Sequence, residues 1–419
     1  MTFDYIIIGG GISGLYCLHH LYKKNKDSSI LIVEADDYWG GRLKTHNSPH
    51  YEIGALRFND NHILLKSLLK EMNCPMYPLS NDLLFLDYDR KTKEVTQYDN
   101  VIEMIGTIIK MIIKKSKQYT KKEIQQYTLK EWIDYIFQDE SISKVLIELY
   151  GYESMFRKKN AYDLLLTIDK RSYSNHFYGL KNGFSDLCNK IAKLYQDKKN
   201  IKMCLHTFID RIEPCGKSYK VYGKTNKSTK TFEGTKVIIA CKSNDLKTFS
   251  ILKPIFPLLK HIYNTPLLRV VAMYPKINNM LWFENMPKIT TNHPLRKIIP
   301  IDVKKGLITL TYCDGDDIDP YWENKKEKIL KKESQIKTMV QIYLKELFPT
   351  LDIPKPIYFK CHIWNTGIHM WKSKCDSKKI YNQIKHPRKN MYVVGEAFSQ
   401  NQAWIEGGLE TVDQLMNDL

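Results

Sequence analysis

The sequence predicts an α/β protein in which a Rossmann-like dinucleotide-binding domain is interleaved with an α+β domain. Three observations predict this class. A G-x-G-x-x-G motif lies between two apolar runs near the N-terminus, a second glycine pair followed by arginine comes soon after, and an apolar run near the C-terminus ends in Gly395-Glu396. Because both ends of the chain carry strand-and-turn motifs, we expect them to fold into one domain.

The N-terminal motif stands in the context that a dinucleotide site requires. Residues 5–8 (Tyr-Ile-Ile-Ile) read as a buried strand, residues 15–22 as a helix, and residues 30–33 (Ile-Leu-Ile-Val) as a second strand. The motif at residues 9–14 falls between the first strand and the helix, which is where this fingerprint has meaning. We therefore expect a βαβ unit that binds a dinucleotide.

The three glycines of this motif and the acidic residue after the second strand each have a physical task. Gly9 allows a tight turn, Gly11 lets backbone N–H groups approach a pyrophosphate, and Gly14 lets the helix lie close to the sheet. The helix N-terminus would face the phosphates with its partial positive charge. Glu34, which follows the second strand, would accept hydrogen bonds from a ribose diol and so disfavours the 2′-phosphate of NADP.

A second motif narrows the choice of dinucleotide. Gly40-Gly41-Arg42 follows Glu34 closely, and the stretch at residues 51–58 (Tyr-Glu-Ile-Gly-Ala-Leu-Arg-Phe) comes next. An NAD-dependent dehydrogenase has no need of a second glycine pair and an arginine at this place. The alternative is a glycine turn with a surface arginine, which the strand and the carboxylate upstream disfavour.

With two motifs further along, these residues resemble the flavin-containing amine oxidoreductase family, which includes monoamine, polyamine and L-amino-acid oxidases. Residues 178–184 are similar to the family's return into the flavin domain, and residues 391–411 look like its terminal strand and helix. The resemblance implies an amine oxidase-like fold, in which a Rossmann-like FAD-binding domain is interleaved with an α+β substrate domain. The FAD-binding domain would comprise residues 1–85, 178–265 and 385–419, and the substrate domain residues 86–177 and 266–384.

The resemblance implies FAD as the cofactor and assigns residues to each part of it. The pyrophosphate and the adenosine would be held by Gly9, Gly11, Gly14, Glu34 and the strand that carries Ile209 and Ile212. The phosphates and the flavin would be flanked by Gly41, Arg42, Leu56, Arg57, Glu396, Trp404 and Ile405. Glu396 would either accept hydrogen bonds from the ribityl hydroxyls or lie near the diphosphate. The last helix would point its N-terminus at the flavin, because reduced flavin is anionic.

Candidate catalytic residues also come from the resemblance. Trp404 would occupy one position of the family's aromatic cage, with Trp364 as a candidate for the facing wall and core packing as its alternative. Arg269 stands where the family usually has a lysine, and arginine cannot readily give up a proton. His369 is expected to be a hydrogen-bonded structural residue. The family motif that tethers flavin through cysteine is missing around Cys361 and Cys375, so we expect non-covalent FAD.

The function implied is that of an FAD-dependent oxidase, which takes a hydride from the alpha carbon of an amine or amino acid and is reoxidised by dioxygen to hydrogen peroxide. Arg269 or Arg296 could clamp an amino-acid carboxylate, whereas a polyamine would need carboxylates. The alternatives are a flavin-dependent sugar-nucleotide mutase and a non-catalytic flavin-binding protein.

Composition sets further limits. The chain has 419 residues, 43% of them hydrophobic, a net charge of +18 and nine cysteines without a C-x-x-C pair, so we expect no zinc site and no disulfide framework. No apolar run is long enough to span a bilayer, and the first strand begins too early for a signal peptide. We expect a soluble, intracellular protein, or a virion component, since the AT-biased composition is found in large DNA viruses and cellular parasites. We favour solvated helix faces over nucleic-acid binding as the origin of the charge.

Outside the βαβ unit, the spacing of apolar residues predicts helices over residues 101–117, 121–137, 184–194 and 323–347. It predicts strands near Ile209, at residues 237–240, and over residues 267–274, 297–301, 307–312 and 357–363. The later strands suit a sheet that floors a substrate cavity.

Overall fold

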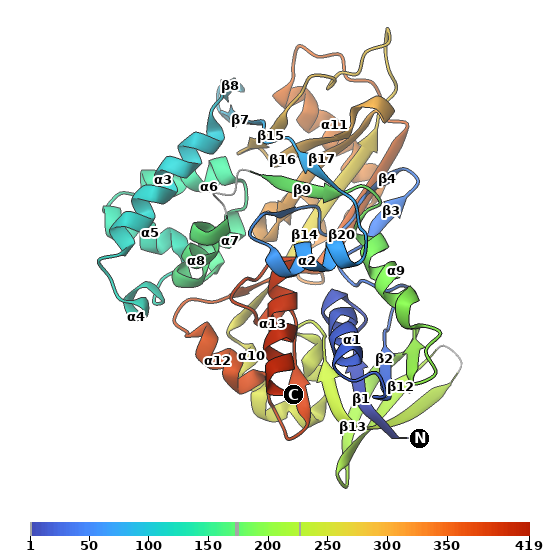
Figure 1. Ribbon diagram of the computed structural model, residues 1–419. Helices are drawn as coiled ribbons and strands as arrows, with labels where there is room; N and C mark the ends of the chain where they lie inside the picture. The colour runs from blue at the N-terminus through green and yellow to red at the C-terminus, as the bar shows by residue number, and fades with distance from the viewer. Residues whose placement is uncertain (1, 172–175, 226–227) are drawn as a thin grey trace.

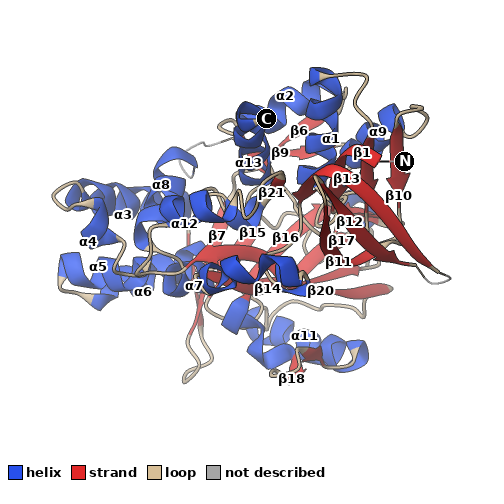
Figure 2. Ribbon diagram, turned by 90° about the horizontal axis from the view of Figure 1, so that it is seen from below, coloured by secondary structure: helices blue, strands red, loops and turns tan. Residues whose placement is uncertain are grey.

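A computed structural model describes residues 2–171, 176–225 and 228–419. Residues 172–175, which belong to the expected substrate domain, lie outside the described residues. The chain forms two sheet-based lobes, with a group of helices beside the second lobe (Figure 1). Both chain ends lie in the first lobe, in which the helices cover the strands seen in Figure 2.

The first sheet has the strand order β10–β2–β1–β13–β12–β11, with β21 paired to β13. The bounds of its strands are β1 Thr2–Ile8, β2 Ile30–Val33, β10 Ile201–Cys204, β11 Phe208–Cys215, β12 Ser218–Lys224, β13 Thr229–Ile239 and β21 Met391–Val393. β1 pairs in parallel with both β2 and β13, and β21 pairs in parallel with β13. The two ends of the chain therefore share one sheet, as expected.

The central strands are apolar throughout because both faces of this sheet are covered. Ile7 and Ile32 face a cluster formed with α1 (Ile12–Lys24), α2 (Ile63–Glu71), α9 (Phe184–Tyr195) and α13 (Ile405–Asp418). Their neighbours Ile6 and Leu31 face the opposite cluster, which includes η2 (Ser250–Ile255) and α12 (Ser377–Ile384). Because successive side chains of a strand point to opposite faces of the sheet, the first lobe has one hydrophobic core on each face. The remaining short helices of this lobe are η1 (Asp245–Thr248), α10 (Phe256–Leu259) and η5 (Glu396–Phe398).

The second sheet has the order β20–β14–β17–β16–β15–β7–β8. Its strands are β7 Leu83–Tyr88, β8 Val95–Tyr98, β14 Ile262–Met273, β15 Lys288–Thr291, β16 Lys297–Asp302, β17 Leu307–Asp314 and β20 Tyr358–Trp371. Helix α11 (Glu333–Leu347) packs its apolar side on one face, through Ile336, Val340 and Leu344. Shorter elements around this sheet are η3 (Val303–Lys305), η4 (Gly315–Tyr321), β18 (Trp322–Asn324) and β19 (Ile329–Leu330).

Two small sheets connect the lobes. One pairs β3 (Thr45–Asn47) with β4 (His50–Glu52), and the other has the order β5–β9–β6, from Phe58–Asn59, Phe177–Leu180 and Met76–Leu79. The expected domain boundaries at residues 85 and 265 each fall inside a strand of the second sheet, β7 and β14. A division that keeps these strands whole would fall just before each of them.

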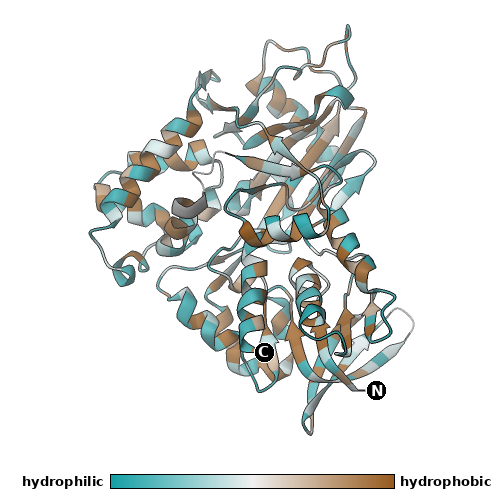
Figure 3. Cartoon of the chain, viewed as in Figure 1, coloured by the Kyte–Doolittle hydropathy of each residue, from teal (hydrophilic) through white to brown (hydrophobic). Residues whose placement is uncertain are grey.

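The helical group comprises α3 (Val101–Ser116), α4 (Lys121–Ile124), α5 (Leu129–Phe137), α6 (Glu140–Tyr150), α7 (Glu153–Lys158) and α8 (Ala161–Arg171). Hydrophobic and hydrophilic bands alternate along α3 (Figure 3), and its residues Ile109 and Ile112 are buried against α5 and α8. Within the described residues, no helix combines the length and the apolarity needed to cross a bilayer.

Two expected helices differ from the structure. The segment 121–137 is divided into α4 and α5, because Thr128 begins a new helix with a capping box to Glu131. The segment 323–347 is helical only from Glu333 onward. Its first part forms the β18–β19 hairpin, in which Lys328 takes a left-handed conformation with φ 56°.

Substitution of Gly14 tests how closely α1 must pack against the first sheet. A Cβ added there would collide with the carbonyl oxygen of Gly9, which belongs to the turn that leads from β1 into α1. We expect Gly14→Ala to push α1 off the sheet and to destabilise the protein by about 1–3 kcal/mol, as overpacking does. Urea unfolding of the protein without added ligand measures this. Gly216→Ala is not a suitable control because Gly216 has φ 61°, so Lys217→Ala in the exposed turn between β11 and β12 serves instead. Equal stability of Gly14→Ala and the parent protein would refute the packing role.

Candidate functional site

A cavity of about 460 Å³ opens at the carboxyl ends of the parallel strands of the first sheet. Its walls include residues that directly follow β1, β2, β13 and β21, and it continues to residues of β14, β17 and β20 in the second sheet. Ligands of open α/β sheets bind at this edge of the strands, and the volume lies within the range of small-molecule sites. The cavity is therefore the candidate functional site.

The glycine loop forms the floor of the cavity. Gly9 has φ 108°, which favours glycine, and its N–H donates to the carbonyl of Val33 over 2.8 Å. Gly11 is the N-cap of α1 and no side chain caps that helix. A Cβ on Gly11 would find its nearest atom, the carbonyl oxygen of Gly40, at 3.9 Å. The helix N-terminus thus faces open space that suits a phosphate group.

Glu34 lies on the cavity wall at the end of β2. Its carboxylate accepts hydrogen bonds from the backbone N–H groups of Gly10 (2.6 Å) and Asp36 (2.9 Å). Burial raises the pKa of Glu34, and these two hydrogen bonds oppose that shift. A carboxylate offers about four acceptor positions, so acceptor capacity remains for a ribose diol. Ile209 also lines this end, whereas Ile212 is buried in the core and does not.

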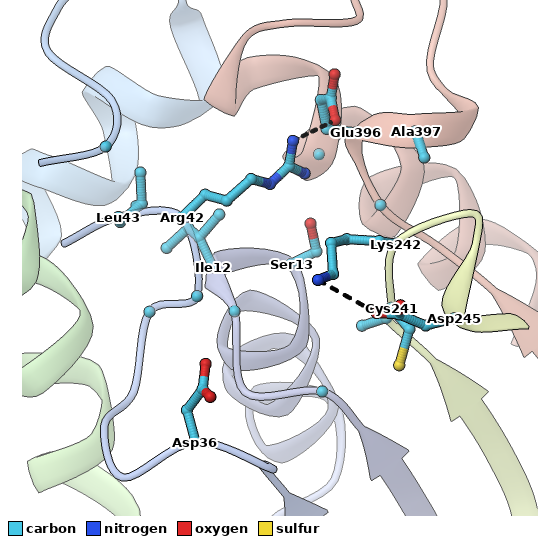
Figure 4. Close-up of a pocket in the computed structure, with 18 of the residues that line it drawn as sticks. Ile12, Ser13, Asp36, Arg42, Leu43, Cys241, Lys242, Asp245, Glu396 and Ala397 are labelled. Carbon is cyan, nitrogen blue, oxygen red and sulfur yellow. Dashed lines mark ion pairs between the residues drawn. The ribbon is translucent and has the colours of Figure 1, made fainter. Parts of the chain in front are cut away.

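Arg42 reaches across the cavity to Glu396 (Figure 4). Its Nη1 lies 2.9 Å from Glu396 Oε2 and also donates to the carbonyl of Gly367 over 2.8 Å. The same carboxylate accepts from the ring Nδ1 of His369 (2.7 Å), from its backbone N–H (3.2 Å), and from the N–H of Ala403 (2.6 Å). Burial alone would raise the pKa of Glu396, but Arg42 and His369 hold it far below its ordinary value.

This network involves the carboxylate for which two roles were expected. The carboxylate of Glu396 is engaged by four protein donors, which is about as many hydrogen bonds as a carboxylate can accept. His369 is fully buried and serves as a hydrogen-bonded structural residue, as the sequence indicated. In the described residues, its Nε2 has no hydrogen-bond partner.

The far end of the cavity is aromatic. Trp364, Trp404 and Tyr312 line it together with Leu267 and Ile368. The indole N–H of Trp364 donates to the carbonyl of Ile53 over 3.2 Å, which fixes that ring in the wall. Trp371, by contrast, is buried in the core and donates to the carbonyl of Ser399. Tyr312 carries no sequence motif and was not among the expected site residues.

The last helix begins at this aromatic end. Trp404 is the N-cap of α13, no side chain caps the helix, and Ile405 also lines the cavity. Ala403 before it has φ 73°, a conformation that costs free energy in a non-glycine residue. Its N–H donates to Glu396, so the same carboxylate that binds Arg42 holds the strained turn. Trp404 packs edge-on against His62 and parallel to Phe177, with ring centroids 4.8 and 6.4 Å away.

Four expected site residues do not line the cavity: Gly14, Leu56, Arg57 and Arg269. Gly14 acts through packing, and Leu56 is half-buried nearby. Arg57 stacks on Phe177, 4.3 Å from the ring centroid. Arg269 is buried behind Tyr312, 4.5 Å from its ring centroid, and donates to the carbonyl of Glu52.

Arg296, the other arginine considered for binding an amino-acid carboxylate, is already paired within the protein. Arg296 is buried and its Nε lies 3.1 Å from a carboxylate oxygen of Asp317, while its Nη1 donates to the carbonyl of Thr291. It does not line the cavity. The structure thus removes Arg296 from the residues that could hold a substrate.

Glu396→Gln tests the central network. The substitution keeps the shape but leaves Arg42 without its counter-ion in a mostly buried site, so we expect a loss of about 3 kcal/mol in unfolding free energy. Asp245→Asn is the matched control, because Asp245 also lines the cavity but pairs with Lys242 over 3.6 Å at a half-exposed position. The control should change stability by about 0–1 kcal/mol. Chemical denaturation of both variants measures the difference, and equal losses would contradict the assigned role.

Comparisons with known proteins agree with this geometry. The model of the family described as flavin containing amine oxidoreductase matches residues 12–411. An uncharacterized protein of Acanthamoeba polyphaga mimivirus, R188, is 19% identical over 483 residues, which cover 99% of this chain and 93% of that protein. A corticosteroid-binding protein of Candida albicans is 34% identical over 97 residues, which are 21% of this chain and 19% of that protein. The mimivirus relative supports a large DNA virus as the source.

Two solved structures of putrescine oxidase variants with redesigned cofactor binding share the architecture. Their TM-scores are 0.78 and 0.77, and each alignment covers 100% of this chain and 98% of the other. The identities are 14% and 15%, so the likeness concerns the fold alone. The predicted amine oxidase-like α/β fold is confirmed. Since the family model spans nearly the whole sequence, the chain belongs to the flavin-containing amine oxidoreductase family.

Proposed function

We propose that the protein binds FAD non-covalently in this cavity and oxidises an amine or an amino acid at the alpha carbon. The observation that carries the proposal is the continuity of the cavity. One end offers a glycine turn, an uncapped helix N-terminus and Glu34, and the other end offers aromatic walls and the start of α13. An elongated dinucleotide with a flavin at one end matches this sequence of surfaces.

The residues at the first end would hold the cofactor. Gly11 leaves room for the pyrophosphate, Glu34 would accept hydrogen bonds from the adenosine ribose, and Ile209 would contact adenine. Arg42, placed by Glu396, keeps a permanent positive charge beside the diphosphate position. Lys242 lines the same region (Figure 4).

The reaction needs a substrate whose amine is unprotonated and whose alpha C–H faces the flavin. The substrate loses a hydride from carbon and a proton from nitrogen and becomes an imine, which water hydrolyses to a carbonyl compound. Bound flavin would supply the two-electron acceptor for this oxidation, and dioxygen would take the two electrons together with two protons to give hydrogen peroxide.

The chain's own residues would orient the substrate and exclude water. Trp404 and Trp364 form walls that guide the amine. The N-terminus of α13 offers partial positive charge where negative charge develops. Arg269 would not replace a lysine in proton exchange, because a guanidinium does not readily release its proton. Its buried guanidinium contributes a fixed charge behind Tyr312.

The non-covalent attachment of FAD rests on the positions of the cysteines. Cys361 and Cys375 do not line the cavity, and Cys375 is part of a buried core. Cys241 does line it, but lies beside Asp245 and Glu34 at the adenosine end. All nine cysteines are free thiols, which also supports our proposal that the protein works inside a cell.

Gly11→Ala tests the cofactor assignment. Because the added methyl group, apart from its chain neighbours, would meet no atom nearer than the carbonyl oxygen of Gly40, at 3.9 Å, the thermal stability of the flavin-free variant should stay close to that of the parent. The methyl group would occupy the place of the pyrophosphate, so the Kd for FAD should rise by about tenfold or more, a loss of about 1.4 kcal/mol. Fluorescence titration with FAD measures it. Undiminished FAD affinity in a folded variant would overturn the placement.

An anaerobic substrate screen tests the reaction. The FAD-loaded protein is mixed with monoamines, polyamines and amino acids, and the loss of flavin absorbance is followed. We expect one class to bleach the flavin and, in air, to yield one hydrogen peroxide per substrate oxidised. Bound FAD that no compound reduces would refute the oxidase and favour the non-catalytic protein or the sugar-nucleotide mutase. Turnover of a UDP-sugar without peroxide identifies the mutase.

A further inference from the structure

The second sheet places one charged side chain next to the aromatic end of the cavity. On β14, Leu267 lines the cavity and Arg269 follows two residues later, so both side chains leave the same face of the sheet. The partners of Arg269 on the neighbouring strands are Tyr312 and His362, and the partner of Leu267 on β20 is Trp364. The guanidinium therefore lies in a row of side chains directly beside the row in which Leu267 and Trp364 form part of the cavity wall.

The segment after β4 covers this guanidinium from the other side. Nη1 of Arg269 donates to the carbonyl of Glu52, and Gly54 and Ala55, which follow closely, line the cavity. Arg269 is only 2% exposed. Its guanidinium carbon lies 4.5 Å from the ring centroid of Tyr312, which also lines the cavity. One aromatic ring therefore separates a buried positive charge from the cavity.

This positive charge has no counter-ion. Within residues 2–171, 176–225 and 228–419, Arg269 forms no ion pair, and its Nε and Nη2 have no hydrogen-bond partner. The carboxyl group of Glu52, in the covering segment, accepts instead from the hydroxyl of Thr45 over 3.0 Å and from the backbone N–H of Phe184 over 2.8 Å. A buried charge without a partner is costly, so a negative charge in the cavity would recover part of that free energy.

The side chains that share this face with Arg269 supply no negative charge. The hydroxyl of Tyr51 lies 2.7 Å from Nε2 of His362 and 2.8 Å from the hydroxyl of Tyr358. Histidine and tyrosine are not anionic near pH 7. Burial and then Arg269 also lower the pKa of His362 to about 4, which is the effect expected of a neighbouring cation that nothing neutralises.

We propose that Arg269 stabilises the negative charge that FAD gains on reduction, and that it thereby raises the reduction potential of the bound cofactor. This inference rests on the proposed function, because it needs FAD in the cavity with the flavin at the aromatic end. A hydride carries two electrons and one proton, so an oxidised flavin that accepts one gains one negative charge. The guanidinium keeps its own charge, moves no proton and acts through its field from behind Tyr312.

Substitution of Arg269 tests the inference through the reduction potential of bound FAD, which is measured anaerobically by equilibrium with a reference dye and needs no substrate. Arg269→Gln removes the charge. We expect the ratio of reduced to oxidised FAD at a fixed potential to fall at least about tenfold, which lowers the midpoint by about 30 mV for two electrons. Arg269→Lys keeps the charge and should retain most of the parent's potential near pH 7. Arg269→Gln with bound FAD at the parent's potential would overturn the inference.

Arg211→Gln is the matched control. Arg211 also stacks on a tyrosine, with its guanidinium carbon 3.8 Å from the ring centroid of Tyr222, but it is exposed, pairs with Glu213 and does not line the cavity. Its substitution should leave the potential unchanged. The affinities for oxidised and reduced FAD are also measured separately, because a purely structural role of Arg269 would weaken both alike. Equal weakening of the two affinities by Arg269→Gln would overturn the inference.

Arg269→Lys decides the question if Arg269→Gln does not fold. A buried ammonium can release its proton whereas a guanidinium does not, so the potential of this variant should fall more steeply than that of the parent between about pH 7 and pH 10. Identical pH profiles would overturn the inference. A lowered potential in a protein whose flavin no amine or amino acid reduces would remove the oxidase and keep the inference, whereas a protein that binds no FAD would overturn both.

Discussion

The ion pair between Arg42 and Glu396 is the interaction on which the site depends. It joins the loop after β2 to the turn after β21, and through Gly367 and His369 it includes β20 of the second sheet. A buried carboxylate is costly unless charge and hydrogen bonds compensate it, and here four donors do so. Removing either the loop after β2 or the turn after β21 would leave a charge uncompensated, so the network needs both of these segments, and β20 of the second lobe adds further hydrogen bonds to it. The same carboxylate restrains Ala403 at positive φ and thereby sets where Trp404 begins the last helix.

Local rules explain what could be predicted from the sequence. The glycines of the first turn, the apolar strands and Glu34 follow from backbone geometry over a few residues, and the structure places them accordingly. The break between α4 and α5 was predictable too, since Thr120 and Thr128 each precede a glutamate by three residues, the signature of a capping box. The hairpin before α11 was not, because Lys328 adopts a left-handed conformation that no glycine or asparagine announces.

The rest of the site depends on contacts between distant segments. Nothing near Tyr312 in the sequence marks it as part of the cavity wall, and it reaches the cavity because β17 pairs with β14, which carries Leu267 of the same wall. For the same reason Arg57 and Arg269, expected beside the cofactor and the reacting atoms, lie behind aromatic rings. Sequence position indicates which segments approach a cavity, but only packing decides whether a side chain reaches its surface or lies behind it.

Net charge and fold likeness both say little about the substrate, and the local arrangement of charge says more. A surplus of +18 is distributed mainly over exposed lysines, where water and salt screen it. Behind the aromatic wall, the guanidinium of Arg269 is buried against Tyr312 in a medium of low polarity, where its field is screened much less. A single buried charge close to the cavity can therefore act on a bound ligand more strongly than many solvated lysines do.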